Sequence, residues 1–225
     1  MMIALPNRDG SFTCTLFWPL EGARSFAALR TERDVLRYFT ATFPDAVPLM
    51  PTLTADYFQN AVSSLVSIRC SPWSYRDRAV LLGDACHAVV PFYGQGANAA
   101  FEDCAVLNEC IVTHAPDWEA AFARYQALRK RHTDALADLS MANFVEMRDH
   151  TASRAFLLAR RLEKDLHRLF PTRFTPLYTM VTFTRMPYAD AVLKARRQSL
   201  IVKAVAAGLA LAVAVLLLVW AFLLK

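Results

Sequence analysis

Glycine is scarce in this sequence, and the positions of the few glycines exclude one class of nucleotide-binding unit. Only six of the 225 residues are glycine. No G-x-G-x-x-G motif occurs inside a βαβ unit in the first part of the chain. Such units need these glycines for a tight turn and for close approach of the backbone to a pyrophosphate. We therefore expect no complete dinucleotide-binding unit within these residues.

Cysteine and histidine are also sparse, and their spacing indicates neither a disulfide framework nor a metal site. The five cysteines form no C-x-x-C pair, which a zinc knuckle would show. His132 and His150 would share one face of a helix, but about 27 Å of helix axis would separate them. We expect no bound metal. The sequence also offers no catalytic triad or pair of carboxylates, so no catalytic residue is assigned.

Positive charge is concentrated in one place. Part of the net charge of +5 comes from four cations that lie close together in the sequence: Lys194, Arg196, Arg197 and Lys203. No stripe of lysine and arginine with interleaved aromatic residues occurs elsewhere. The chain is therefore not expected to bind nucleic acid.

One long run has no charge at all. Residues 204–224 are AVAAGLALAVAVLLLVWAFLL, and as a helix they would span roughly 30 Å, the thickness of a hydrocarbon core. We expect a transmembrane helix, within a tail anchor of residues 201–225 that binds the lipid bilayer; a fully buried core helix is the alternative. Because the basic cluster precedes this run and only Lys225 follows it, we expect a single-pass protein with a cytosolic body.

The remaining residues indicate an α/β (α+β) fold in which a small sheet is followed by helices. Two β-rich runs, Met2 to Leu5 and Phe12 to Trp18, flank the turn sequence PNRDGS and predict a β-hairpin. Two further strands are expected in the segments LVSIRC and AVLLGD. Apolar spacing and capping residues predict helices over residues 22–41, 97–112, 117–150, 153–169 and 188–203. We expect a domain over residues 1–115, a helical region over 116–200, and the anchor.

The most informative stretch is GDACHAVVPFYGQGANAAFED, residues 83–103. Gly94, Gly96 and Ala99 satisfy G-x-G-x-x-A, a variant of the dinucleotide fingerprint. That fingerprint should follow a strand directly and be followed by a second strand. Pro91 interrupts the residues before Gly94, and only helices are expected afterwards. The match is therefore coincidental.

The same stretch has the features of a different ligand contact. Glycines let the backbone approach a ligand closely, and the first amides of a helix that starts near Ala97 present donors to a negative group. Asp84 follows a buried strand, where a carboxylate accepts hydrogen bonds from hydroxyl groups such as those of a sugar or ribityl chain. The alternative is that Asp84 only caps the following turn.

The pattern G-D-A-x-H-x-x-x-P, followed by G-Q-G-x-N-x-x-x-x-D, resembles the second FAD motif of the group A flavoprotein aromatic hydroxylases. Its members in this sequence are Gly83, Asp84, Ala85, His87, Pro91, Gly94, Gln95, Gly96, Asn98 and Asp103. Four further segments, MMIALPN, SFTCTLFWP, ADLSMANFVEMRDH and PLYTMVTFTRMPY, are similar to the kynurenine 3-monooxygenases within this family. The likeness extends from residue 1 to about residue 190.

The resemblance implies an NADPH- and FAD-dependent monooxygenase that hydroxylates L-kynurenine to 3-hydroxykynurenine, in the kynurenine pathway of tryptophan degradation. It implies that Asp84 contacts the ribityl or phosphate part of FAD. It also implies that Ala97 and Asn98, together with Gly94 and Gly96, meet the flavin at a helix N-terminus, where amides and the helix dipole stabilise the negative charge of reduced flavin.

The resemblance also implies where the substrate binds. Asn143 and Tyr178 match positions that bind L-kynurenine in the family, and three consecutive residues are expected to line the pocket above the flavin: Pro91, Phe92 and Tyr93. Leu5 and Phe17, from the opening hairpin, are further candidates. Such a pocket is expected to be apolar and aromatic, because its groups orient the substrate and exclude water.

The family further implies groups that these residues do not supply, namely the unit that holds the ADP half of FAD and an Arg and a Tyr that hold the amino-acid carboxylate. We expect a C-terminal portion of an enzyme that needs this N-terminal half, in cis or in trans, to bind FAD and turn over kynurenine. Two alternatives stay open: an FAD hydroxylase of another aromatic or isoprenoid substrate, and a non-catalytic membrane-anchored docking protein. In a eukaryote the anchor would lie in the mitochondrial outer membrane; a bacterial inner membrane fits the sequence equally well.

Overall fold

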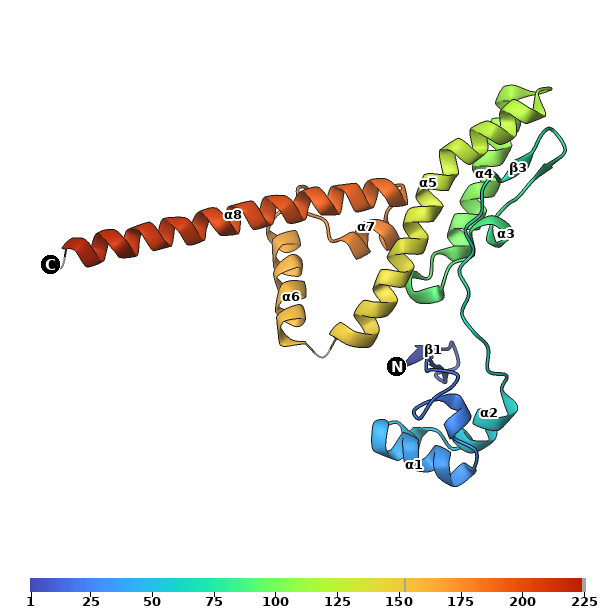
Figure 1. Ribbon diagram of the computed structural model, residues 1–225, viewed down its shortest axis with the longest axis horizontal. Coiled ribbons are helices and arrows are strands. Elements are labelled where there is room, and N and C mark those ends of the chain that lie inside the picture. The colour runs from blue at the N-terminus through green and yellow to red at the C-terminus, as the bar shows by residue number, and fades with distance from the viewer. Residues whose placement is uncertain (152, 224–225) are drawn as a thin grey trace. The chain divides into compact units, whose positions relative to one another are not determined.

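The computed structural model describes residues 1–151 and 153–223, and these fall into two compact units (Figure 1). The first unit comprises Met1–Leu65 and the second Val66–Lys225. The described residues are mostly helical, with a small two-stranded sheet in each unit. Helices therefore determine most of the packing in the second unit, where residues 83–103 lie.

The first unit opens with the predicted β-hairpin. Strand β1 (Met2–Pro6) pairs with β2 (Phe12–Leu16) in antiparallel register, with Ala4 opposite Cys14. The turn is held by the Asp9 side chain, which accepts hydrogen bonds from the backbone and hydroxyl of Ser11 at 3.0 and 2.7 Å. The turn chemistry read from PNRDGS is thus what closes the hairpin.

Helix α1 (Glu32–Thr42) starts ten residues later than the helix predicted over residues 22–41. Thr31 and Asp34 form a capping box, in which each side chain accepts from the other's backbone amide at 3.2 Å. This cap fixes the helix start, whereas Gly22, with φ +108°, belongs to the preceding turn. The remaining elements of this unit are the 3₁₀ turns η1 (Phe26–Ala28) and η2 (Val47–Leu49) and helix α2 (Leu53–Gln59).

The core of the first unit is small. Val35 and Phe39 on α1 pack against Leu53 on α2, and aromatic rings surround them. The closest ring pair is Trp18 and Tyr38, whose centroids lie 4.2 Å apart. Aromatic contacts therefore compensate for the few fully buried aliphatic groups.

The strands predicted in the second unit are largely absent from the described residues. The segment LVSIRC forms no strand, and AVLLGD contributes only β4 (Ala79–Val80), which pairs with β3 (Ser74–Tyr75). In the segment before β3, Ile68 donates its N–H to the Ala88 carbonyl at 2.8 Å and Trp73 accepts from Leu81 N–H at 2.7 Å. A strand requires a paired neighbour, so β-rich composition alone misled this prediction.

Helices of the second unit follow the sequence closely. Helix α3 (Asp84–His87) and the 3₁₀ turn η3 (Pro91–Tyr93) precede α4 (Gly96–His114). Asp117 caps α5 (Trp118–Val145), which ends in a π-helical turn, η4 (Glu146–His150). The last three helices are α6 (Arg154–Leu169), α7 (Leu177–Phe183) and α8 (Tyr188–Leu223). The predicted helices 97–112, 117–150 and 153–169 are confirmed within a few residues.

Helices α4 and α5 pack side by side and form the centre of the second unit (Figure 1). One cluster of buried residues joins Trp73, Cys86 and Cys110 to Tyr125 on α5. A second cluster joins α4 and α5 to α7 and α8 and includes Ala99, Leu136, Met180 and Ala191. Residues on both sides of the predicted boundary at 115 and 116 therefore share one core.

No helix in the described part of the chain is both long enough and apolar enough to span a membrane. The run predicted to do so, residues 204–224, falls on the end of α8, where residue 224 and many of the side chains lie outside the described residues. The earlier part of α8 carries Asp190, Lys194 and Lys203, and charged groups are costly in hydrocarbon. The transmembrane helix stays a prediction.

Candidate functional site

The segment that carries Asp84 packs directly on α4. Gly83, which precedes α3, has φ +58°, and a Cβ atom at this residue would lie 3.1 Å from Cβ of Ala100. A larger residue would meet both backbone strain and this close contact, so the turn requires glycine. The predicted close approach of a ligand to Gly94 and Gly96 is a separate matter and stays a prediction.

The Asp84 carboxylate is available to a ligand. Asp84 is the first residue of α3, its side chain is exposed, and none of the described residues hydrogen-bonds its carboxylate. The N-cap position of α3 is occupied by Gly83. Capping of the turn therefore does not account for Asp84.

The N-terminus of α4 is also open. Its N-cap is Gln95, whose side chain does not cap the helix. The first amides belong to Gly96, Ala97 and Asn98, which have no acceptor within an α-helix. Ala97 and Asn98 are exposed, and the Asn98 amide donates to Gln95 Oε1 at 3.0 Å. This end of α4 therefore presents N–H groups and the positive end of the helix dipole to a polar or anionic group.

A buried ionic network lies beneath these two open groups. The Asp103 carboxylate, fully buried on α4, accepts from Arg129 Nε at 2.6 Å, from Gly83 N–H at 3.2 Å and from His87 Nε2. Arg129, on α5, is 2 % exposed and also donates to the Ala99 carbonyl at 3.2 Å and pairs with Glu102 at 2.7 Å. The network joins α3, α4 and α5.

Electrostatics keep Asp103 ionised. Burial by itself would raise the pKa of this carboxyl, but the hydrogen bonds and charges of His87 and Arg129 outweigh that effect and lower it. Burial and the nearby Asp103 raise the pKa of the Cys86 thiol to about 12. At neutral pH the network therefore contains a carboxylate and an arginine, next to a protonated thiol.

Cys86, His87 and Asp103 also form a group that sequence reasoning missed as potential metal ligands. Their ligand atoms lie within 4.8 Å of one another in the described structure. The Cys86 thiol donates to the Gly83 carbonyl at 3.3 Å, and both Asp103 oxygens already accept hydrogen bonds. These atoms satisfy one another, and a metal would require a deprotonated thiol. We assign the group to the ionic network.

A cavity of about 420 Å³ lies between α5, α6 and α7. Three of the predicted substrate residues line it: Tyr93 from η3, Asn143 from α5 and Tyr178 from α7. The ring centroids of Tyr93 and Tyr178 are 5.7 Å apart. The structure thus gathers residues from three distant parts of the sequence at one hollow.

The other two predicted lining residues have different places. Phe92 is buried against Phe144, with ring centroids 4.6 Å apart, and its carbonyl accepts from Asn143 Nδ2 at 2.7 Å. Pro91 is exposed and does not line the cavity. Phe92 therefore orients the Asn143 side chain through this hydrogen bond and does not itself line the cavity. Leu5 and Phe17 belong to the first unit.

Helix α6 supplies a polar wall to the cavity that the sequence reasoning did not anticipate. The wall consists of Arg160, Glu163, Lys164 and His167. These residues are spaced by three or four positions and so share one helical face, a signal that was present in the sequence. Arg160 pairs with Glu146 at 2.5 Å and with Glu163 at 2.6 Å.

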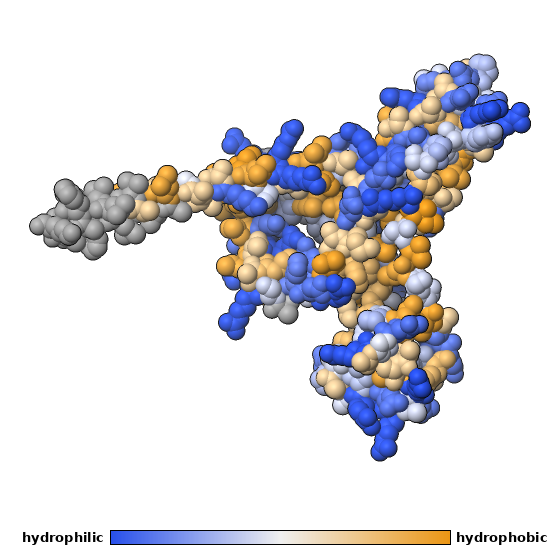
Figure 2. All heavy atoms as spheres, viewed as in Figure 1, coloured by the Kyte–Doolittle hydropathy of each residue, from blue (hydrophilic) through white to orange (hydrophobic). Residues whose placement is uncertain are grey.

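The polar and apolar faces of α6 are reversed relative to those of an ordinary surface helix. Its polar face lines the cavity, while Leu158, Leu162 and Leu169 are at least half exposed on the opposite face. Figure 2 shows apolar surface of this kind over α6. A helix at a protein surface normally turns its apolar face inward.

Tyr93 is one of two tyrosines that line the cavity. Burial, with the nearby Glu146 carboxylate, raises the pKa of Tyr93 to about 12. The hydroxyl therefore remains protonated at neutral pH and can donate a hydrogen bond. With the Asn143 amide, it gives the cavity neutral polar groups among aromatic rings.

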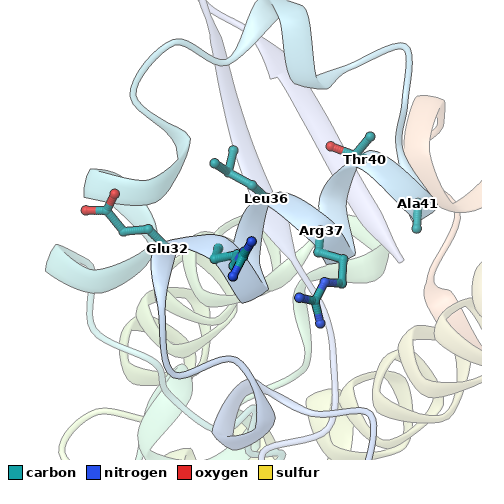
Figure 3. A pocket seen from close by; sticks show the side chains of 6 residues that line it. Glu32, Leu36, Arg37, Thr40 and Ala41 are labelled. Carbon is teal, nitrogen blue, oxygen red and sulfur yellow. The ribbon is translucent and has the colours of Figure 1, made fainter.

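A second hollow, of about 760 Å³, lies on the first unit. Figure 3 shows that its lining side chains, including Glu32, Leu36 and Arg37, all project from α1. One helix face cannot enclose a small molecule, because ligand sites are concave and bury most of the ligand surface. We assign no site to it.

Comparison with known proteins agrees with the motif. Residues 48–140, which include α3, α4 and most of α5, match the family model described as an FAD binding domain. The names of the curated relatives indicate a narrower class of protein than this family model does. The chain is 53 % identical over 213 residues to a kynurenine 3-monooxygenase of Salinispora arenicola (strain CNS-205), covering 95 % of this chain and 47 % of that protein.

Two further relatives are less identical to the chain. The kynurenine 3-monooxygenase of Flavobacterium johnsoniae is 50 % identical over 192 residues, covering 85 % of this chain and 43 % of the relative. That of Dictyostelium discoideum is 46 % identical over 203 residues, covering 85 % and 44 %. The resemblance to kynurenine 3-monooxygenases is thereby confirmed. The chain spans about half the length of the curated relatives it matches.

Proposed function

We propose that this chain forms the flavin-facing and substrate-facing part of an FAD-dependent monooxygenase that converts L-kynurenine to 3-hydroxykynurenine with NADPH and O₂. One observation carries the proposal: Tyr93, Asn143 and Tyr178, taken from three separate elements, line one cavity. The same unit holds the open N-terminus of α4 and the exposed Asp84. Family names of the relatives and the matched FAD domain support the same reaction class.

The residues present fit the ribityl and isoalloxazine parts of FAD. Asp84 has an exposed carboxylate that would accept from ribityl hydroxyls, and the amides of Gly96, Ala97 and Asn98 would donate to a group that gains negative charge on reduction. FAD, when bound, supplies the redox chemistry through which NADPH and O₂ hydroxylate an aromatic ring. The unit that holds the ADP half of FAD is assigned to a further half of the protein.

The cavity fits a small aromatic amino acid. Its volume of about 420 Å³ is within the range of small-molecule pockets, which combine apolar walls with a few placed polar groups. We assign the rings of Tyr93 and Tyr178 to the aromatic part of the substrate and the Asn143 amide to its polar end. The protein groups orient the ring and exclude water; no acid–base residue is required of them.

Complementation tests the proposal. The chain is co-expressed with the half of the Salinispora arenicola relative that it does not cover, and kynurenine-dependent NADPH oxidation and 3-hydroxykynurenine are measured. We expect product from the pair and none from either half. Asn143→Ala should raise KM for kynurenine about tenfold or more, since it removes a hydrogen bond to a buried polar group.

A matched variant controls for general damage. Asn108, exposed on α4, lies outside the cavity, so Asn108→Ala should leave KM unchanged. A complemented pair that oxidises NADPH with another aromatic or isoprenoid compound and ignores kynurenine would support the related-hydroxylase alternative. A pair that never retains flavin would leave only the non-catalytic docking protein.

A further inference from the structure

Asp103 is the centre of the buried network, yet no contact proposed above uses it. Its carboxylate is fully buried and accepts three donors from two elements other than its own helix. Burying an ionised group is costly unless it is paired and hydrogen-bonded. Because burying this carboxylate is costly, we expect Asp103 to have a role other than packing.

The carboxylate holds both ends of the segment that carries Asp84. Gly83 immediately precedes Asp84 and donates its backbone N–H, while His87, the last residue of α3, donates or shares its ring Nε2. Helix α3 has only four residues, and so short a helix is not stable by itself. Its position therefore depends on tertiary contacts, which are the burial of Cys86 and the two hydrogen bonds to Asp103.

The other oxygen of the same carboxylate connects to the first turns of α4 through Arg129. Arg129 bonds Asp103 Oδ1, the Ala99 carbonyl and Glu102, so its three guanidinium nitrogens contact residues within two turns of α4. Ala99 directly follows Asn98, whose amide lies at the open end of the helix. One carboxylate thus links the Asp84 segment with the amides of Ala97 and Asn98.

We propose that Asp103 is a positioning residue that sets the spacing between the Asp84 carboxylate and the N-terminal amides of α4, the two groups that must meet the same flavin. The inference rests on the proposed function for its ligand. The attachment of residues 83–87 to α4 is observed independently of any ligand, in the hydrogen bonds within the chain. Catalytic geometry tolerates only a small displacement of such groups.

Riboflavin is the probe for flavin binding, because it contains the ribityl chain and the ring system of FAD and lacks the ADP half. Binding to the full chain, co-expressed with the other half as in the complementation test, is followed by quenching of riboflavin fluorescence. We expect Asp103→Asn to raise the Kd about tenfold or more, the loss of one hydrogen bond to a charged group. Arg129→Lys, which keeps the charge and loses the fork, should have an intermediate effect.

Two variants separate positioning from general loss of stability. Asp138→Asn makes the same chemical change at an exposed pair with Arg69, and Leu136→Ala destabilises the core at a fully buried residue of α5. Both should change the riboflavin Kd less than twofold at temperatures where the chain is folded. Equal losses of affinity in Leu136→Ala and Asp103→Asn would overturn the proposal.

Hydrogen exchange tests the geometry without any flavin. Asp103→Asn should speed amide exchange in residues 83–87 and 96–99 at least tenfold, with the first unit unchanged. Unchanged exchange in those two segments, or an increase spread over the whole second unit as in Leu136→Ala, would contradict the inference. Failure of the unaltered complemented pair to bind riboflavin would count against the proposed function, and the exchange result would still decide the role of Asp103.

Discussion

Two charged clusters in the second unit use similar groups and differ in burial. Asp103 and Arg129 are 0 % and 2 % exposed, whereas Arg160 with Glu146 is 42 % and 31 % exposed at the rim of the cavity. Removing one partner of a buried pair leaves an uncompensated charge, while an exposed pair is screened by water. The first cluster therefore fixes the backbone, and the second can rearrange around a ligand.

The largest difference should come from Arg129→Ala. Asp103 would keep its burial and lose its cationic partner, so we expect a loss of about 3–5 kcal/mol in the free energy of unfolding. Urea denaturation followed by circular dichroism measures this loss. Arg131→Ala is the control on the same helix, because Arg131 pairs with Asp190 at an exposed position. Equal effects of the two variants would remove the distinction between the clusters.

Acid should affect the buried cluster next. The pKa of Asp103 is lowered in the folded chain, so its contribution to stability is complete above the unfolded pKa of about 3.9. That contribution is lost as the pH falls through the lower, folded pKa. We expect the stability difference between the unaltered chain and Asp103→Asn to shrink below about pH 4. A difference that grows under acid conditions would mean that Asp103 is protonated in the fold.

A smaller change in stability is expected at the rim. Arg160→Ala should change the free energy of unfolding by at most about 1 kcal/mol, since the ion pairs are partly exposed to solvent. The same substitution removes the polar bridge between Glu146 and Glu163 at the cavity. In the complemented enzyme we expect a clear rise in KM for kynurenine, although the free energy of unfolding changes little. An unaltered KM would show that α6 only borders the site.

The smallest effect is expected at the exposed pair of Arg69 and Asp138. The Asp138 side chain is 74 % exposed, so Asp138→Asn should leave the melting temperature unchanged within error. Differential scanning calorimetry in low and high salt measures it. A clear, salt-dependent loss would show that the extended segment before β3 depends on this pair for its attachment to α5.

Local signals predicted the elements whose contacts are also local. The turn residues of PNRDGS and the Asp117 cap are side-chain interactions within a few positions, and the hairpin and α5 follow from them. The strand expected in LVSIRC needed a neighbour from elsewhere in the chain, which composition does not reveal. The start of α1 was wrong because the capping box at Thr31 was not recognised.

The candidate site was predictable only in part. Asn143 and Tyr178 came from family resemblance, since a polar residue in a helix and a half-buried ring carry no signal of their own. A 3₁₀ turn and no strand directly precedes Gly94 in the described structure, as Pro91 indicated, and the contact of the fingerprint glycines with a ligand stays a prediction. The link among Gly83, Asp103 and Arg129 depends on tertiary packing of three elements, which no periodicity encodes.

The outward leucines of α6 have a practical consequence for work on the isolated chain. A row of exposed apolar side chains on a helix favours association between molecules, so sample behaviour will depend on concentration. Light scattering should accompany every binding titration, and mild detergent below its micellar concentration offers a way to keep molecules apart. Apparent affinities measured on crowded samples would otherwise report aggregation.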